Sequence, residues 1–213
     1  MSAPLLPTRT VDRAAIDVTV VGFGGGPIGN LFSAVPAAEA DEVIDAAWRA
    51  GIRTFDTAPL YGHGLSEHRL GHALLGRPRE HYVLTTKVGR RLVPSPRGSF
   101  DTGLWVDVPP LRAEYDYSYD GVLRQVEDSL QRMCQDRFDI LLVHDIDRYT
   151  HGPAQPQRFR EAIEGAFPAL VQLRAEGLVR AIGVGVNEAD VCAEVIRQVD
   201  VNVVLLAGRY TLL

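Results

Sequence analysis

The stretch TFDTAPLYG, residues 54–62, decides how this sequence folds and where its chemistry lies. It is typical of a short β-strand that ends on a carboxylate, Asp56, and is followed in the next turn by Tyr61. Two later apolar runs end in a similar way: YVLTTKV carries Lys87 near its end, and FDILLVH ends on His144. Polar side chains suited to chemistry therefore stand at the ends of three successive strands.

Runs that are typical of strands alternate along the chain with runs of helical periodicity. The strands are apolar enough to be covered on both faces, which predicts an α/β fold with a parallel sheet and right-handed crossovers. We expect strands at residues 18–23, 54–56, 82–88, 138–144, 181–186 and 203–206. We expect helices at residues 37–50, 66–75, 120–134, 160–176 and 188–199.

Three local features refine this expectation. Ser66 can cap the second helix, and Pro168 interrupts or kinks the fourth. Residues 89–119 form a long, proline-containing irregular stretch, which we interpret as a loop over the substrate and not as a domain boundary. We therefore expect residues 1–213 to belong to a single domain.

Composition excludes several classes of function. The 213 residues carry 27 acidic and 22 basic side chains, a net charge of −5, so the basic stripe typical of nucleic-acid binding is missing. No apolar run approaches the ~20 residues of a membrane span, and the start MSAPLLPTRT does not resemble a signal peptide. Cys134 and Cys192 lie in apolar-periodic segments, which predicts buried thiols. We expect a cytoplasmic globular protein.

The four strand-end residues suit proton transfer to or from a substrate oxygen. In a closed parallel barrel the carboxyl ends of the strands converge on one mouth, where catalysis takes place. The pKa of tyrosine is ordinarily about 10, and we expect the ammonium of Lys87 to lower it for Tyr61 while Asp56 holds the lysine. His144 can bind the same substrate oxygen. The alternative for each residue alone is a buried salt bridge or an isolated histidine.

Three stretches resemble signature motifs of the aldo-keto reductases: DTAPLYG at residues 56–62, TTKV at residues 85–88 and LVH at residues 142–144. LRAEGLVRAIG, residues 173–183, is similar to the passage from that family's fourth helix to its fifth strand. The resemblance implies a (β/α)8 TIM barrel. It also implies hydride transfer between NAD or NADP and a carbonyl or hydroxyl carbon of a small sugar or aldehyde.

The resemblance also implies roles for individual residues. Tyr61 would be the general acid/base, tuned by Lys87 and Asp56, and His144 would orient the substrate. Asp56 would contact the cofactor as well.

Four further residues complete the cofactor site that the resemblance implies. Gly24 and Gly25 would let the backbone pass close to the cofactor. Asn187 would hold the nicotinamide carboxamide, although Val186 precedes it where the family usually has serine. Tyr210 matches an aromatic residue that stacks under the nicotinamide.

Trp105 and three alternating tyrosines lie in or next to the long loop, at positions 115, 117 and 119. Two interpretations remain open for them. They can line the substrate pocket, where Trp105 would contact the substrate, or they can pack the loop onto the barrel.

Within the family, the sequence looks most like the aldose 1-dehydrogenases, a subgroup that includes D-threo-aldose and L-fucose dehydrogenases and is related to the pyridoxal 4-dehydrogenases. The leading hypothesis is that the anomeric hydroxyl of a cyclic aldose gives its proton to Tyr61 while hydride leaves C1 for the nicotinamide, which yields a lactone. The alternatives are a pyridoxal dehydrogenase, a general aldehyde or ketone reductase, and a nicotinamide-binding regulatory module without significant catalysis.

Three patterns point elsewhere. GGGPIG, residues 24–29, matches the Rossmann fingerprint, but prolines delay the helix that should follow directly. His68 and His72 have a spacing that can bind zinc, but no third ligand accompanies them, so we expect a solvated helix face and no metal site. Arg90 and Arg91 can attract a phosphate, although exposed basic pairs are common.

The number of strands falls short of a complete barrel. We count six βα-type strands, whereas a barrel needs eight and typically about 250 residues. A six-stranded piece would have two open sheet edges and an exposed apolar interior. We therefore expect the sequence to lack the C-terminal part of its barrel.

Overall fold

The computed structural model describes residues 6–208, and its centre is a six-stranded parallel sheet. In order across the sheet the strands are β3 (Phe23–Gly24), β4 (Thr54–Asp56), β5 (Val83–Val88), β8 (Ile140–His144), β9 (Ala181–Val186) and β10 (Val203–Leu206). Because the strands follow one another in chain order, the sheet has barrel topology. A Rossmann sheet reverses its strand order instead, so the alternative drawn from GGGPIG is wrong.

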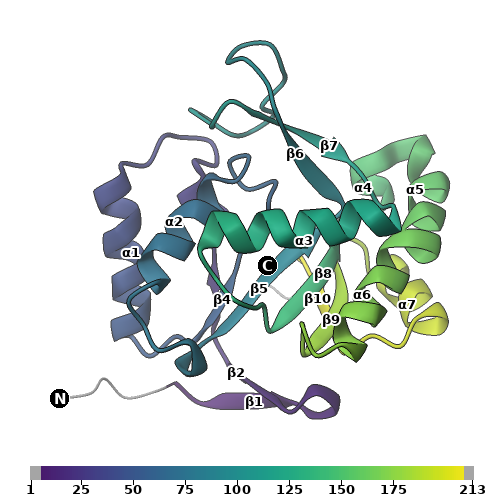
Figure 1. Ribbon diagram of the computed structural model, residues 1–213, viewed down its shortest axis with the longest axis horizontal. Helices are drawn as coiled ribbons and strands as arrows, with labels where there is room; N and C mark the ends of the chain where they lie inside the picture. Colours follow the sequence, from purple (N-terminus) through teal and green to yellow (C-terminus); the bar gives the residue numbers. More distant parts are fainter. Residues whose placement is uncertain (1–5, 209–213) are drawn as a thin grey trace.

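Helices cover one face of the sheet (Figure 1). They are α1 (Ala37–Arg49), α2 (Leu65–Leu74), α3 (Tyr119–Met133), α4 (Arg148–His151), α5 (Gln155–Glu161), α6 (Phe167–Ala175) and α7 (Ala189–Gln198). Alternate strand residues, such as Phe55, Leu84 and Leu141, pack into the core beneath these helices. The residues between them face the opposite side, as the pleat of a strand requires.

That opposite side is the barrel interior. Val83, Ile140 and Leu142 form a second apolar cluster there, closed at one end by Ile16. Residues of β3 and β10, at opposite edges of the sheet, line the same hollow of about 410 Å³. The sheet therefore curls around this interior. Among the described residues, β3 and β10 each pair on one side only, as expected for six strands of a (β/α)8 barrel.

The predicted strand at residues 18–23 is wrong, because the chain divides there. β1 (Thr8–Val11) and β2 (Ile16–Thr19) form an antiparallel hairpin across one end of the barrel, and β3 begins only at Phe23. Thr19 explains the break: its backbone N–H donates to the Thr54 hydroxyl, and its own hydroxyl donates to the carbonyl of Val21. These bonds turn the backbone between the two strands.

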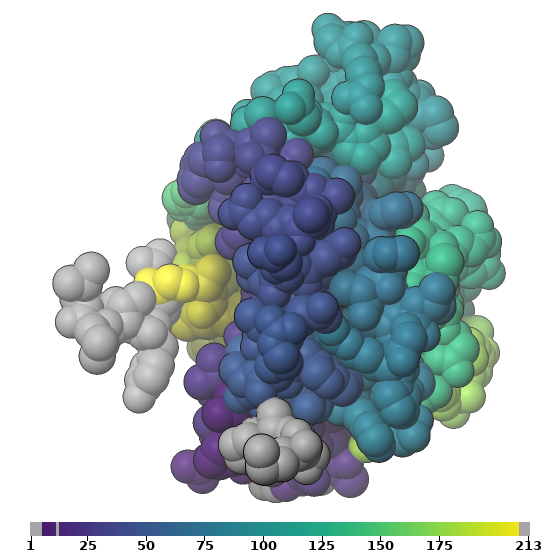
Figure 2. All heavy atoms as spheres, turned by 90° about the vertical axis from the view of Figure 1, so that its left-hand side faces the viewer, coloured from purple at the N-terminus to yellow at the C-terminus, as the bar shows by residue number. Residues whose placement is uncertain are grey.

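The long segment at residues 89–119 is less irregular than expected. It contains an antiparallel hairpin, β6 (Arg90–Pro94) and β7 (Leu111–Tyr115), at the opposite end of the molecule from β1 and β2 (Figure 1). In the space-filling view this teal hairpin stands above the body of the protein (Figure 2). The loop between its strands returns to the barrel through hydrogen bonds between Asn30 and Val106.

The predicted helices are confirmed, with local differences. The fourth begins before residue 160, as α4 and α5, and a π-helical turn (Ala162–Ala166) then leads into α6. Pro168 comes just after this turn, so the helix changes its hydrogen-bonding pattern next to the proline that was expected to interrupt or kink it. Ser66 is not a cap: Gly64 precedes α2, and the Ser66 hydroxyl donates to the Gly25 carbonyl.

Only one of the two cysteines is buried. Cys192 packs in the core, as expected. Cys134 is exposed, because it ends α3 in the left-handed conformation and leaves the apolar face of the helix. Among residues 6–208, none of the helices combines the length and apolar character that crossing a bilayer requires.

The contact between α2 and α3 generates a stability prediction. A Cβ at Gly71 would collide with the backbone of Met133, whereas a Cβ at Gly76 would meet no atom within 4 Å. Gly71→Ala should therefore lower the free energy of unfolding by about 2 kcal/mol through overpacking. The matched control Gly76→Ala should change it by less than about 0.5 kcal/mol. Urea denaturation of both variants checks this, and equal stabilities would contradict the close packing.

Candidate active site

The ammonium of Lys87 joins two of the other predicted site residues. Its Nζ donates to Asp56 Oδ2 at 2.7 Å, to the Thr57 carbonyl at 2.8 Å and to the Tyr61 hydroxyl at 3.1 Å. The side chain is only 1% exposed. All three ammonium donors are thus used. Asp56 pairs in register with Thr85 on the neighbouring strand, and Lys87 lies two residues after Thr85, so both side chains point into the barrel.

His144 ends β8 and also lies beside Tyr61. The two ring centroids are 5.8 Å apart, and the rings meet edge to face at 80°. Burial lowers the pKa of His144 well below its ordinary value, and the positive charges of Arg90 and Lys87 lower it further. The imidazole is therefore neutral near pH 7, with one nitrogen able to donate a hydrogen bond and the other able to accept one.

The electrostatics of Tyr61 correct the expectation drawn from the sequence. Burial raises the pKa of Tyr61 above its ordinary value, and the charge of Lys87 only partly offsets this. The carboxylates of Asp56 and Asp145 raise it further. Lys87 thus acts on the pKa of Tyr61 in the expected direction, but burial outweighs it, and the depth of the site is a tertiary property that the motif does not reveal. Tyr61 is protonated at neutral pH, and Lys87 makes its phenolate less unfavourable than burial alone would.

Lys87 remains a cation at neutral pH. Burial acts to lower the pKa of Lys87, but the interactions with Asp56 and Tyr61 outweigh it and raise this pKa above its ordinary value. A fixed positive charge therefore lies within hydrogen-bond distance of the Tyr61 oxygen.

Trp105 reaches this site from the loop between β6 and β7, where it pairs with Leu31. Its ring centroid is 5.5 Å from that of Tyr61, and the rings are tilted by 32°. The tyrosines behave differently: Tyr117 is buried and donates its hydroxyl to the His144 carbonyl at 2.8 Å, while Tyr119 packs against the core. The tyrosine that is still solvent-exposed, Tyr115, stacks on Tyr117. The tyrosines thus pack the hairpin, and Trp105 lies beside the site.

The residues around Asp56 fit a polar, hydroxyl-bearing cofactor. Asp56 Oδ1 is buried and has no hydrogen-bond partner among the described residues, so an acceptor is left for a hydroxyl such as that of a ribose. Gly24 has open space where a side chain would lie. Gly25 does not, because a Cβ there would come within 2.6 Å of the Ser66 hydroxyl. Packing therefore accounts for Gly25 without a ligand.

Of the other two predicted cofactor residues, Asn187 lies in the described part of the chain. Asn187 follows β9, and its side-chain amide donates to Asp147 Oδ2 at 3.0 Å and to Asp145 Oδ1 at 3.3 Å. Tyr210 lies outside the described residues. The role of Asn187 in holding a carboxamide stays a prediction.

Sequence reasoning missed an ion pair next to His144. Arg90 is not an exposed, phosphate-attracting residue: it is buried and its Nη2 lies 2.9 Å from Asp145 Oδ2. The exposed interpretation holds for Arg91, which pairs with Glu114 at the surface of the hairpin. The sequence feature that could have pointed to this pair is the acidic residue Asp145 directly after His144.

The zinc pattern on α2 has no structural counterpart. His68 and His72 are both exposed, as the solvated-face interpretation expects. Over residues 6–208 no group of three or more histidine, cysteine or acidic side chains is arranged to hold a metal ion.

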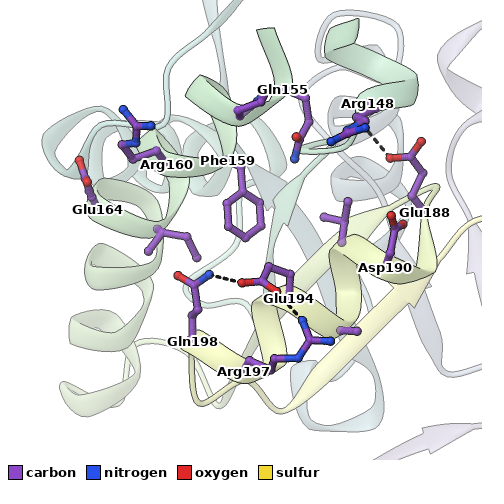
Figure 3. Close-up of a pocket in the computed structure, with 14 residues that line it drawn as sticks. Arg148, Gln155, Phe159, Arg160, Glu164, Glu188, Asp190, Glu194, Arg197 and Gln198 are labelled. Carbon is purple, nitrogen blue, oxygen red and sulfur yellow. Dashed lines mark hydrogen bonds and ion pairs between the residues drawn. The ribbon is translucent and has the colours of Figure 1, made fainter. Parts of the chain in front are cut away.

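Another hollow, of about 730 Å³, lies between α5 and α7 (Figure 3). Figure 3 shows Phe159 pointing into it between charged side chains. Gln198 and Arg197 are bonded to Glu194 along one wall. Tyr61, Lys87 and His144 do not line it, so this groove is separate from the site.

A profile described as the aldo/keto reductase family matches residues 20–213. The chain belongs to the aldo/keto reductase family. It is 41% identical to a pyridoxal 4-dehydrogenase of Microbacterium luteolum, over 96% of this chain and 63% of that protein. It is 42% identical to a D-threo-aldose 1-dehydrogenase of a Pseudomonas species, over 94% of this chain and 60% of that protein. The chain thus spans about three fifths of the length of these two relatives.

Solved aldo-keto reductase structures agree with the fold. One from Bacillus halodurans superimposes with a TM-score of 0.69 at 25% identity, over 94% of this chain and 57% of that one. The predicted barrel class is confirmed, and the Asp56, Tyr61, Lys87 and His144 cluster lies at the carboxyl ends of its strands, where barrel enzymes place their chemistry.

The protonation state of His144 in this aldo/keto reductase can be measured directly. Because burial and two neighbouring cations lower its pKa, its ring should stay neutral between about pH 6 and pH 8. Nitrogen NMR of the labelled protein, assigned with a His144→Asn variant, should show neutral-ring shifts throughout. A titration with a midpoint near that of free imidazole would contradict the described environment.

Proposed function

We propose that the chain belongs to an NAD(P)-dependent dehydrogenase that oxidises the anomeric hydroxyl of an aldose to a lactone, with Tyr61 transferring the proton. The observation that carries this proposal is the hydrogen bond from buried Lys87 to the Tyr61 hydroxyl, beside a neutral His144. Similarity to a D-threo-aldose 1-dehydrogenase supports the substrate class.

Proton transfer falls to Tyr61. As its phenolate, Tyr61 removes the proton of the substrate hydroxyl, and as its phenol it returns a proton in the reverse direction. Lys87 lies 3.1 Å from the Tyr61 oxygen and stabilises the negative charge that develops there. Asp56 holds the ammonium in place at 2.7 Å. The bound nicotinamide supplies the hydride acceptor.

Orientation falls to His144 and Trp105. Neutral His144 can donate one hydrogen bond to the substrate oxygen, which fixes it next to Tyr61. Trp105 adds an aromatic surface beside Tyr61. Asp56 Oδ1, Gly24 and Asn187 are the described residues that would contact the cofactor, and Tyr210 is a further candidate.

Two alternatives use the same site. The similarity to a pyridoxal 4-dehydrogenase favours pyridoxal as a second candidate substrate, and the same residues would serve a general aldehyde or ketone reductase. A regulatory module that only binds nicotinamide has no need of a lysine beneath a tyrosine, so the arrangement around Lys87 argues against it.

Absorbance of reduced nicotinamide, recorded with full-length protein, tests the proposal. L-Fucose, D-arabinose, D-galactose and pyridoxal are each offered with NAD and then with NADP, and growth of reduced cofactor with a sugar is expected. Turnover of pyridoxal alone, or only of aldehydes in the reductive direction, would favour the corresponding alternative. Tight cofactor binding without any turnover would favour the regulatory module.

Tyr61→Phe removes only the hydroxyl. We expect a loss of at least about 1,000-fold in kcat, because general acid/base catalysis and alignment of the oxygen are lost together. Cofactor affinity, measured by fluorescence titration, should change less than about twofold, since binding does not depend on that hydroxyl. Tyr149→Phe, at a tyrosine that is 79% exposed, is the matched control and should keep full activity. A normal kcat for Tyr61→Phe would refute the assignment.

A further inference from the structure

A buried ion pair directly beside His144 has no role in the proposed proton transfer. Arg90 is the first residue of β6, and Asp145 follows the last residue of β8. Their side chains are only 7% and 15% exposed, and Arg90 Nη2 lies 2.9 Å from Asp145 Oδ2. The pair thus connects the hairpin over the site with the barrel strand that carries His144.

The pair has hydrogen-bonding capacity that the described residues do not use. Arg90 Nη1 is buried and has no hydrogen-bond partner among them. Asp145 Oδ2 lies 3.5 Å from His144 Nε2, and Asp145 Oδ1 accepts a hydrogen bond from Asn187 at 3.3 Å. The ion pair therefore offers an unpaired N–H of Arg90 together with the Asp145 carboxylate, which lies next to His144.

Fastening the hairpin does not explain this arrangement. Tyr117 already fastens it, since its hydroxyl donates to the His144 carbonyl at 2.8 Å and lies 3.2 Å from the Asp145 carbonyl. Gln125 also accepts a hydrogen bond from the N–H of Gly89 at the base of the hairpin. A buried ion pair is a poor fastener because desolvation opposes it, and a buried donor without a partner is unfavourable. A polar group bound between Arg90 and Asp145 would give the unpaired Nη1 an acceptor and would offset part of the desolvation of the ion pair.

We propose that Arg90 and Asp145 form a subsite for a substrate hydroxyl on the carbon next to the reacting carbon. This hydroxyl would accept a hydrogen bond from Arg90 Nη1 and donate one to Asp145. The inference rests on the proposed function, in that the reacting oxygen lies between Tyr61 and His144. The subsite selects substrates with two adjacent hydroxyl groups, such as aldoses, over aldehydes that have none at that position.

The proximity of the pair to the proton-transfer groups supports this placement. The charge of Asp145 acts on Tyr61, and the charge of Arg90 acts on His144. The geometry agrees, because Asp145 Oδ2 lies 3.5 Å from His144 Nε2 and the His144 ring lies 5.8 Å from the Tyr61 ring, so a group held by the pair would lie beside the two residues proposed to bind the reacting oxygen. Since a hydroxyl is at once donor and acceptor, it matches an arginine N–H and a carboxylate together.

A pair of pentoses tests the subsite. D-Arabinose and 2-deoxy-D-ribose differ only in the C2 hydroxyl, and the wild-type protein should favour D-arabinose by about 100-fold or more in kcat/KM. Asp145→Asn and Arg90→Lys should each lower kcat/KM for D-arabinose by about 30-fold, as expected of hydrogen bonds to charged groups. For 2-deoxy-D-ribose the change should stay below about threefold, so the preference collapses.

The two variants probe different halves of the subsite. Asp145→Asn keeps the shape of the side chain but removes its charge, and Arg90→Lys keeps a cation for Asp145 but lacks the second nitrogen. Thermal unfolding verifies that each is folded, and Arg90→Lys carries the test if Asp145→Asn is unstable. Glu114→Gln, which breaks the exposed pair with Arg91 on the same hairpin, is the control and should leave the preference unchanged.

Binding gives a readout that does not need turnover. Tryptophan fluorescence reports binding of each pentose to the cofactor-loaded protein, because Trp105 lies beside Tyr61. Selective binding of D-arabinose without its oxidation would support the subsite and contradict the proposed function. If the wild-type protein bound both pentoses with equal affinity and oxidised them with equal kcat/KM, the subsite would be overturned. Equal losses for both pentoses in the variants would also overturn it, since the pair would then only position His144.

Discussion

The ammonium of Lys87, buried inside the barrel, is the interaction on which the site depends. A buried cation is unfavourable unless acceptors surround it. Here three acceptors converge on it, from the end of β4, from the residue after it and from the following turn. That convergence requires β4 and β5 to be parallel neighbours in the observed register. The position of Tyr61 and the charge beneath its hydroxyl follow directly from this requirement.

Two layers of structure maintain the arrangement around Lys87. Outside the sheet, the helices bury the alternate strand residues, which fixes the pleat and turns Asp56, Lys87 and His144 inward. At the carboxyl ends of the strands, the β6–β7 hairpin and its loop bring Trp105 to Tyr61 and Arg90 to Asp145. The barrel thus places the groups proposed to transfer the proton, while the hairpin supplies groups that would distinguish one substrate from another in the proposed subsite.

Much of the fold and the main cluster could be predicted because the determining patterns are local. Apolar runs that end on Asp56, Lys87 and His144 mark parallel strands, and parallel strands bring their ends together. The burial of Arg90 and its pairing with Asp145 could not be predicted, since these residues are distant in sequence and meet only through the hairpin.

Other differences have the same physical origin. The pKa of Tyr61 depends on the depth of the site, which no motif reveals. The break at Thr19 depends on a hydrogen bond to Thr54, and the exposure of Cys134 depends on the geometry of a helix end. In each case a tertiary contact or a backbone turn outweighs the local pattern.

The pH dependence of aldose oxidation tests most directly whether Tyr61 above Lys87 moves the proton. In the proposed reaction oxidation needs the Tyr61 phenolate, and burial raises the pKa of Tyr61 above its ordinary value of about 10. kcat/KM should therefore rise about tenfold per pH unit from about pH 7, without levelling off below about pH 10. A pH-independent kcat/KM, or one that levels off near neutrality, would contradict the account.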